Sequence, residues 1–329
     1  MFQKLGIILL SVVLLVSCGK KEEAKTDNPV KTGNNFRFTY DVSLPDVKEN
    51  LSEVELLIPV PQDNNFQKIE NITINTNGKY EFGDEYHFGN KYILVTFDDT
   101  LSTVPIAKLT VDVTRMENSN LTSKKFIQPE DSIVLADCLL PDSLVPIDGQ
   151  VAAEAQKVIK DGMTDLEKAK AMYDYLQSTM SYDKSGEGWG RGDAIYACDI
   201  RKGNCTDFHS LFIGMARSQG IPAKFSIGFP LPLNKQEGTI GGYHCWAEFY
   251  VDGYGWIPVD ISEAAKDTTK REYFFGNLDD SRVTFTVGRD LELDTYKETK
   301  SLNFFIYPQV YLNGNEYKGY TKAFSFVKI

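Results

Sequence analysis

Three residues in the middle of the chain, Cys205, His244 and Asp260, are of the types that catalyse acyl transfer with a thiol nucleophile. Cys205 is followed by apolar residues at helical spacing, namely Phe208, Leu211, Phe212, Met215 and Ala216. This spacing predicts a buried helix with Cys205 in its first turn, where free amides and the helix dipole lower a thiol pKa from about 8.5. The Cys205 amide could also hold an oxyanion. Because free cysteines are often simply buried, Cys205 alone is ambiguous.

Residues 244–260 supply the partners that such a cysteine needs. Asp252-Gly253 is a turn signal between two strand-like segments, which predicts a β-hairpin. A three-residue loop centred on residue 252 places Asp260 opposite His244, with Cβ atoms about 4.5–5.5 Å apart. A two-residue loop would shift this pairing by one. In the first register Asp260 fixes the His244 tautomer and stabilises its imidazolium, which leaves the other ring nitrogen to take the thiol proton.

The order of these segments is that of a known enzyme core. The matching motifs are Gly-Asn-Cys at 203–205, Ile-Pro-Ala at 221–223, His-x-Trp-x-Glu at 244–248 and Gly-Trp-x-Pro-x-Asp at 255–260. Over about residues 150–275 the chain resembles the transglutaminase-like superfamily. The resemblance implies a triad of Cys205, His244 and Asp260 and a second oxyanion donor upstream of the cysteine. Trp189 is our candidate, with Tyr182 behind it, although either is also compatible with packing.

His209 and Cys245 raise the alternative of a metal site. His209 follows Cys205 by four residues, so both lie on one helix face. We interpret His209 as a core histidine with satisfied hydrogen bonds, and tuning of the cysteine is the alternative. Cys205 with His209, and His244 with Cys245, have spacings typical of zinc ligands. Adjacent strand residues point to opposite faces, so His244 and Cys245 would not converge on one ion, and we expect neither metal nor organic cofactor.

The segments around this site predict three folded regions. Alternating apolar residues predict a β-sandwich, with strands at 36–42, 54–61, 92–97 and 107–113. The period becomes helical between residues 150 and 182, with one helix at 151–160 and another started by a capping box, Thr164-Asp165-Leu166-Glu167. Alternation returns from Val283, which indicates strands that complete the central sheet or form a small third domain.

The predicted fold class is therefore α+β. A papain/transglutaminase-like cysteine enzyme core, with a helix packed on an antiparallel sheet, is preceded by an antiparallel β-sandwich and followed by a short β-rich C-terminal region. The predicted divisions are a signal peptide at 1–17, a lipidated cysteine and tether at 18–35, the sandwich at 36–140, the catalytic core at 141–278 and the C-terminal β extension at 279–329.

The N-terminus has the features of an export signal. Lys4 precedes an apolar run, Leu5 to Val16, that is shorter than the roughly 20 residues needed to cross a bilayer. Its end, Leu15-Val16-Ser17-Cys18, resembles the lipobox of bacterial lipoproteins, which implies acylation of Cys18. An ordinary cleaved signal is the alternative. We expect a membrane-anchored lipoprotein outside the cytoplasm, in the outer membrane and facing the periplasm or the cell surface.

The net charge restricts the classes of partner molecule, and the cysteine content restricts the possible disulfides. The chain has 46 acidic and 35 basic residues, a formal net charge of −11, which argues against nucleic acid as a partner. With Cys18 acylated and Cys205 kept as a thiol, three cysteines remain for at most one disulfide, namely Cys138, Cys198 and Cys245.

The expected reaction is acyl transfer through a thioester, on a protein or peptide, with cell-wall peptides among the candidates. Water as acceptor, as in a cysteine peptidase or amidase, is the first choice. An amine acceptor would make the protein a cross-linking protein-glutamine gamma-glutamyltransferase. A third hypothesis is a surface binding or scaffold lipoprotein with an inactive core.

Overall fold

The computed structural model describes residues 33–47, 53–98, 103–123, 129–232, 234–295 and 298–329. The expected signal peptide, Cys18 and the tether up to residue 32 lie outside the described residues. The described chain from residue 33 onward belongs to one compact unit. Within it, no helix combines the length and the apolar character that crossing a bilayer requires.

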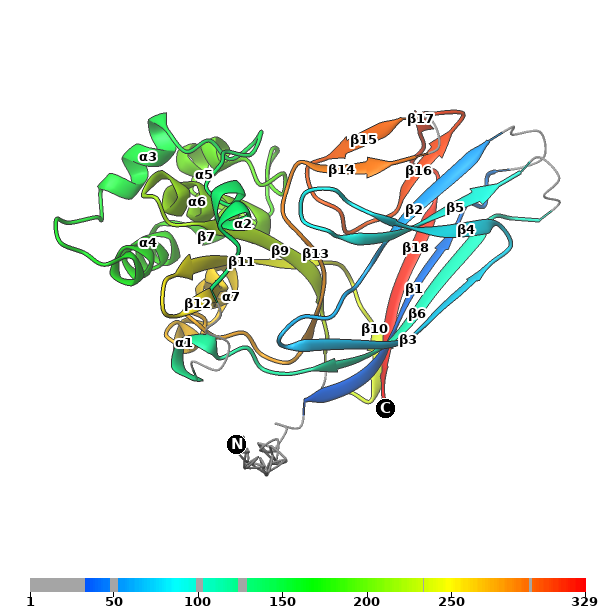
Figure 1. The fold of residues 1–329 in the computed structure, drawn as a ribbon, viewed down its shortest axis with the longest axis horizontal. Coiled ribbons are helices and arrows are strands. Elements are labelled where there is room, and N and C mark those ends of the chain that lie inside the picture. The colour runs from blue at the N-terminus through cyan, green and yellow to red at the C-terminus, as the bar shows by residue number, and fades with distance from the viewer. Residues whose placement is uncertain (1–32, 48–52, 99–102, 124–128, 233, 296–297) are drawn as a thin grey trace, which may run out of the picture. The chain divides into compact units, whose positions relative to one another are not determined.

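Two five-stranded sheets form a β-sandwich (Figure 1). The first contains, in order, β10 (Glu237–Thr239), β18 (Thr321–Lys328), β1 (Asn34–Ser43), β6 (Ile106–Arg115) and β3 (Gln67–Thr76). The second contains β17 (Asn315–Glu316), β16 (Gln309–Leu312), β2 (Val54–Val60), β5 (Lys91–Phe97) and β4 (Lys79–Asp84). Alternate residues of β1, such as Phe36, Phe38 and Tyr40, are fully buried, as a one-sided strand requires.

The expected sandwich strands are present as β1, β2, β5 and β6, while β3 and β4 were not anticipated. Residues 279–329 join both parts of the fold. β13 (Arg282–Val287) pairs with the central sheet, whereas β16 and β18 pair with β2 and β1 of the sandwich. β14 (Leu291–Asp294) and β15 (Thr299–Leu302) form a separate two-stranded hairpin.

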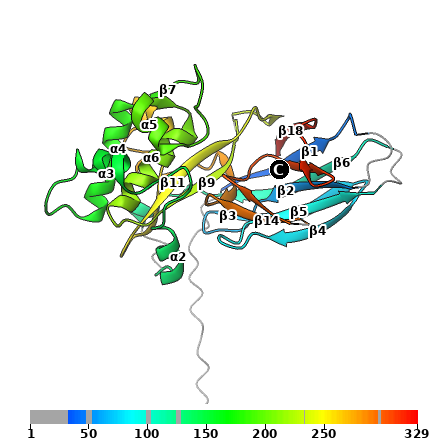
Figure 2. The same ribbon diagram turned by 90° about the horizontal axis from the view of Figure 1, so that it is seen from above.

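The central sheet has the order β12 (Gly255–Val259), β11 (His244–Val251), β9 (Ala223–Pro230) and β13, all antiparallel. Helices α3 (Gly149–Gln156), α4 (Asp165–Thr179), α5 (Ala194–Ile200) and α6 (Cys205–Ser218) gather on one side of β9 and β11 (Figure 2). The remaining elements are α1 (Asn120–Ser123), α2 (Ser132–Asp137), α7 (Ile261–Lys266), a 3₁₀ turn (Thr268–Lys270), β7 (Ser181–Tyr182) and β8 (Lys202–Gly203). The predicted α+β class, with a helix packed on an antiparallel sheet, is confirmed.

Of the two helices predicted between residues 150 and 182, one begins where it was predicted and the other has different bounds. α4 begins with the predicted capping box, in which Glu167 N donates to Thr164 Oγ1 (3.3 Å) and Thr164 N donates to Glu167 Oε2 (2.8 Å). The helix expected at 151–160 is α3, which starts at Gly149 and ends at Gln156.

Candidate active site

Cys205 is the first residue of α6 and is 2% exposed. Asn204 caps the helix, because its Oδ1 accepts a hydrogen bond from Thr206 N (2.9 Å). Asp207 completes a capping box by accepting from Asn204 N (2.9 Å). The predicted placement of the cysteine in the first turn of a buried helix is therefore what the structure shows.

Asp207 also fixes the loop in front of α6. Its carboxylate accepts from Gly190 N (2.8 Å) and Gly192 N (3.1 Å). A Cβ on Gly203 would overlap the same carboxylate, so a glycine is required there for close approach. The loop and the cysteine turn are thus held in a fixed relation by one buried side chain.

The hairpin that carries His244 has a different register from the predicted one. Val251 pairs with Gly255 and Glu248 with Pro258, so the three-residue loop is 252–254 and Gly253 is its middle residue. The prediction that Asp260 lies directly opposite His244 was wrong by two residues. Side chains alternate with a period of two, so this shift leaves Asp260 on the predicted side, where it comes directly after β12.

The His244 and Asp260 side chains nevertheless meet, with Nε2 and Oδ2 2.7 Å apart. Asp260 is the N-cap of α7, and its Oδ1 accepts from Glu263 N (3.1 Å) and Ser262 Oγ (3.1 Å). Arg282 Nη1 donates to Oδ2 (3.0 Å). Burial acts to raise the Asp260 pKa, but the charge and hydrogen bond of His244 and the charge of Arg282 outweigh it and hold the pKa well below its usual range.

The charges of Cys205 and His244 stabilise each other. Burial acts to lower the His244 pKa, but the charge and hydrogen bond of Asp260, together with Cys205, raise it to about 10. Hydrogen bonds from Cys245 and His244 and the charge of His244 hold the Cys205 pKa well below its ordinary value, against the effect of burial. A thiolate and an imidazolium are the forms that these environments favour.

His209 connects the cysteine helix to the aspartate. Its Nε2 accepts from Ile261 N (3.0 Å) and lies 3.7 Å from Asp260 Oδ1. Burial lowers the His209 pKa to about 4, so the ring is neutral and Nε2 remains an acceptor. The structure therefore shows a core histidine with a satisfied ring, and that ring also holds the backbone beside Asp260.

The remaining described cysteines, Cys138, Cys198 and Cys245, are buried and free, with no disulfide between them. Burial raises the pKa of Cys138 and of Cys198 to about 11, and it raises the pKa of Cys245 well above its ordinary value. Cys245 Sγ lies 3.7 Å from His209 Nδ1. Over the described ranges no three His, Cys, Asp or Glu side chains are arranged as a metal site.

The two aromatic candidates for an oxyanion donor differ in placement. Trp189 Nε1 donates to Gly186 O (3.2 Å), within its own loop. Tyr182 in β7 pairs with Gly203 in β8, two residues before Cys205. Burial and the charge of Cys205 raise the Tyr182 pKa to about 12, so its hydroxyl remains a proton donor. The structure brings Tyr182 beside the cysteine turn and gives Trp189 a different partner.

Sequence reasoning missed two arginines. Arg282 lies beyond the matching motifs, and nothing in its sequence context marks it as a partner of Asp260. Arg289 belongs to Gly288-Arg289-Asp290 and donates to Gly192 O (2.7 Å) and Ser210 Oγ (2.5 Å). It therefore links the C-terminal segment to the loop that Asp207 holds.

Two uncharacterised bacterial proteins are similar to this chain in sequence. A protein of Haemophilus influenzae whose function is uncharacterised is 27% identical over 349 residues, which cover 93% of this chain and 94% of that protein. Bacillus subtilis YebA, also uncharacterised, is 30% identical over 132 residues, 36% of this chain and 18% of that protein.

Among solved structures, that of a proposed cysteine protease from Cytophaga hutchinsonii superposes with a TM-score of 0.53 at 16% identity, over 89% of this chain and 98% of that one. At that identity the likeness concerns the fold. The model of the transglutaminase-like superfamily matches residues 152–261, which include Cys205, His244 and Asp260. Residues 152–261 of this chain therefore match the domain of the transglutaminase-like superfamily.

Proposed function

We propose that the protein is a thiol-dependent acyl-transfer enzyme that hydrolyses peptide or carboxamide bonds. Cys205 is the nucleophile, His244 the acid and base, and Asp260 the residue that orients His244. The observation that carries the proposal is the 2.7 Å contact between His244 Nε2 and Asp260 Oδ2 beside a thiol at a helix start. Asp260 occupies one ring nitrogen, which leaves the other to exchange a proton with Cys205.

The first half-reaction forms a thioester. The Cys205 thiolate attacks the carbonyl carbon, and a carbon–sulfur bond forms while the carbonyl oxygen becomes an oxyanion. The carbon–nitrogen bond then breaks, and the His244 imidazolium gives its proton to the departing amine or ammonia. In the second half-reaction water attacks the thioester, His244 takes the water proton, and the carbon–sulfur bond breaks to give a carboxylic acid and the thiolate. No electrons are transferred, so no oxidant or reductant is needed.

The Cys205 amide and the Tyr182 hydroxyl are the oxyanion donors that we propose. The free amide at the start of α6 is an electrostatically favourable donor. Tyr182 is supported by its pairing with Gly203, whereas the indole N–H of Trp189 already has the Gly186 carbonyl as its partner. Trp189 was the first choice from sequence, and its role remains a prediction.

The acceptor decides between hydrolase and cross-linker. Incubation with a glutamine peptide and a labelled primary amine distinguishes them, with the Cys205→Ala variant as control. We expect release of ammonia with formation of the glutamate peptide and no stable label. Stable incorporation of the amine would replace the hydrolase by the cross-linking alternative. Absence of either product, identical to Cys205→Ala, over a panel of peptides would favour the scaffold hypothesis.

We also propose that the enzyme acts on proteins or peptides outside the cytoplasm from a lipid anchor at Cys18. The basis is the sequence Leu15-Val16-Ser17-Cys18 at the end of a short apolar run. Metabolic labelling with a radioactive fatty acid tests it: the protein should carry label, and Cys18→Ala should not. Label that survives this substitution would contradict the anchor without affecting the proposed chemistry.

A further inference from the structure

A cavity lies on the face of the central sheet that points away from α6. Phe249 of β11 packs against Phe212 of α6, so the alternate side chains Trp246 and Glu248 point to the other face. There they line a cavity of about 350 Å³, within the size range of small-ligand sites. Its other wall comes from the sandwich and includes Arg115 at the end of β6.

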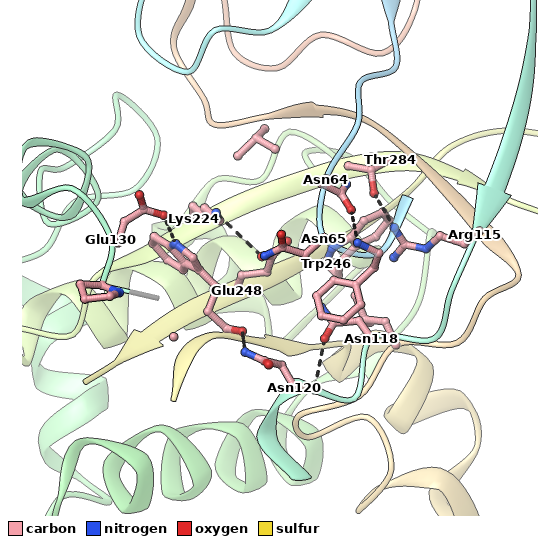
Figure 3. Close-up of a pocket in the computed structure, with 16 residues that line it drawn as sticks. Asn64, Asn65, Arg115, Asn118, Asn120, Glu130, Lys224, Trp246, Glu248 and Thr284 are labelled. Atoms are coloured by element: carbon pink, nitrogen blue, oxygen red, sulfur yellow. Dashed lines mark hydrogen bonds and ion pairs between the residues drawn. The ribbon is translucent and has the colours of Figure 1, made fainter. Parts of the chain in front are cut away.

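The acidic side chains of this cavity have partners. Trp256 Nε1 donates to Glu130 Oε2 (2.7 Å), and Ser226 Oγ donates to Glu248 Oε1 (2.9 Å). Lys224 Nζ lies 3.9 Å from Glu248 Oε2. Figure 3 shows Glu130, Lys224 and Glu248 toward one end of the cavity and Arg115 with Thr284 at the other. Glu130 and Glu248 are therefore satisfied by side chains of the protein itself.

Arg115 is different, because it is buried and makes no ion-pair contact within the described ranges. Its side chain belongs to a residue that is 2% exposed, and within the described ranges no carboxylate forms an ion pair with it. Its Nε is buried and has no hydrogen-bond partner in the described part of the chain. Its Nη1 lies 3.5 Å from Thr284 Oγ1, a long contact. Buried arginines are ordinarily paired, so this one is anomalous.

The surroundings explain why the fold itself does not satisfy Arg115. The Gln67 amide exchanges hydrogen bonds with the backbone of Thr284 (2.9 and 2.8 Å), and Asn64 Oδ1 accepts from Phe66 N (2.9 Å). Burial and the positive charge of Arg282 lower the Arg115 pKa to about 10, and the charges of Glu248, Asp279 and Asp280, which act to raise it, do not outweigh them. An external anion would relieve both effects.

We propose that this cavity binds the carboxylate of a peptide, with Arg115 as the anchoring residue and Trp246 and Trp256 as apolar walls. A guanidinium presents its donors in a planar fork that matches a carboxylate. The rims carry amide side chains, including Asn64, Asn65 and Asn118, which can both donate to and accept from a peptide backbone. The site is distinct from the triad, since none of Cys205, His244 and Asp260 lines the cavity, and its existence does not depend on the proposed acyl transfer.

Tryptophan fluorescence offers a direct test, because two of the three tryptophans in the chain line the cavity. The full-length protein carrying Cys205→Ala, which cannot turn the peptide over, is titrated with N-acetyl-trialanine and with its C-terminal amide. A background with Trp189→Phe restricts the signal to the cavity. We expect saturable binding of the acid and binding of the amide weaker by about tenfold or more.

Variants of arginine identify the anchor. Arg115→Met should abolish the preference for the acid over the amide, and Arg115→Lys should reduce it, because the fork is lost while the charge stays. Arg37→Met is the matched control, since Arg37 lies on the neighbouring strand β1 and already pairs with Asp112 (2.7 Å). It should leave the preference intact. Far-ultraviolet circular dichroism confirms that each variant is folded.

The proposal would be overturned by no saturable binding of the acid by the folded protein, by equal binding of acid and amide, or by a preference that persists in Arg115→Met. Glucuronate and inorganic phosphate serve as competitors of N-acetyl-trialanine. Tighter binding of either competitor than of N-acetyl-trialanine would reject a peptide as the source of the anion. Alkylation of Cys205 in the otherwise unaltered protein should leave the binding unchanged.

Discussion

Arg282 Nη1 donates to Asp260 Oδ2 (3.0 Å), the same oxygen that contacts His244 Nε2. Arg282 is 3% exposed and also pairs with Asp279 (2.8 Å). Burial acts to lower its pKa, but the charges of Asp279 and Asp260 outweigh this and raise it. Asp260 is thus a carboxylate held ionised between two cations, and it stays available to orient the histidine.

Replacing Arg282 by Met should destabilise the protein strongly. The change leaves the fully buried Asp260 with one cationic partner fewer, and breaking a buried ion pair costs about 3 kcal/mol or more. Urea unfolding gives the free energy of unfolding, and Arg37→Met at the more exposed pair with Asp112 provides the control. A change no larger in Arg282→Met than in Arg37→Met would contradict this role.

Asp260→Asn should remove most of the activity. The amide no longer stabilises the His244 imidazolium, so the His244 pKa should fall from about 10 and the thiolate should lose its cation. Loss of such an orienting carboxylate lowers kcat by about a thousandfold or more in comparable triads. Steady-state kinetics on a peptide that the wild type hydrolyses measure it, and a loss below about tenfold would contradict the assigned role.

His209 makes stability depend on pH. Its folded pKa of about 4 lies below the unfolded value of about 6.5, so the unfolded state binds the proton more readily between these values. The histidine therefore lowers the free energy of unfolding as pH falls from about 6.5 toward 4. Once the pH is below both pKa values, the loss is about 3 kcal/mol. His209→Gln should flatten this loss of Tm, and exposed His87→Gln should not. Equal acid dependence in wild type and His209→Gln would refute the assignment.

Gly203→Ala should disturb the cysteine turn specifically. The added methyl group would overlap the Asp207 carboxylate, which holds Asn204 N and the loop at Gly190. We expect destabilisation by about 1–3 kcal/mol, measured by urea unfolding. Gly241→Ala is the control, because its Cβ would meet no atom of the described structure within 4 Å. Equal stability of the two variants would show that the turn can relax.

The sequence predicted the helix start at Cys205 and the meeting of His244 with Asp260 because both depend on local rules. Helical spacing and a terminal glycine define α6, and the period of two on β11 fixes which side chains share a face. The loop register was wrong because Gly253 takes the middle of the loop rather than its end. The contact survives this error because Asp260 leaves the strand and caps α7.

The other parts of the fold and of the site depend on tertiary contacts that no local sequence pattern encodes. Arg282 comes from β13, which pairs with β9, a partner fixed by sheet order rather than by spacing. Likewise, the pairing of β18 with β1 joins segments nearly three hundred residues apart. The sequence favoured Trp189 over Tyr182 only slightly, because both are aromatic residues upstream of Cys205, and the pairing of β7 with β8 that places Tyr182 beside Gly203 is a tertiary contact.

Cys245 and His244 hold Cys205 as a thiolate, and the pH dependence of Cys205 alkylation tests the part played by His244 most directly. Iodoacetamide labelling is followed by mass spectrometry of the Cys205 peptide between about pH 5 and pH 9, with Cys138 and Cys198 as internal controls. The account predicts rapid labelling of Cys205 that persists at the acid end, and a shift of the profile toward an ordinary thiol pKa of about 8.5 in His244→Ala. A wild-type profile that already follows an ordinary thiol, and that His244→Ala leaves unchanged, would contradict it.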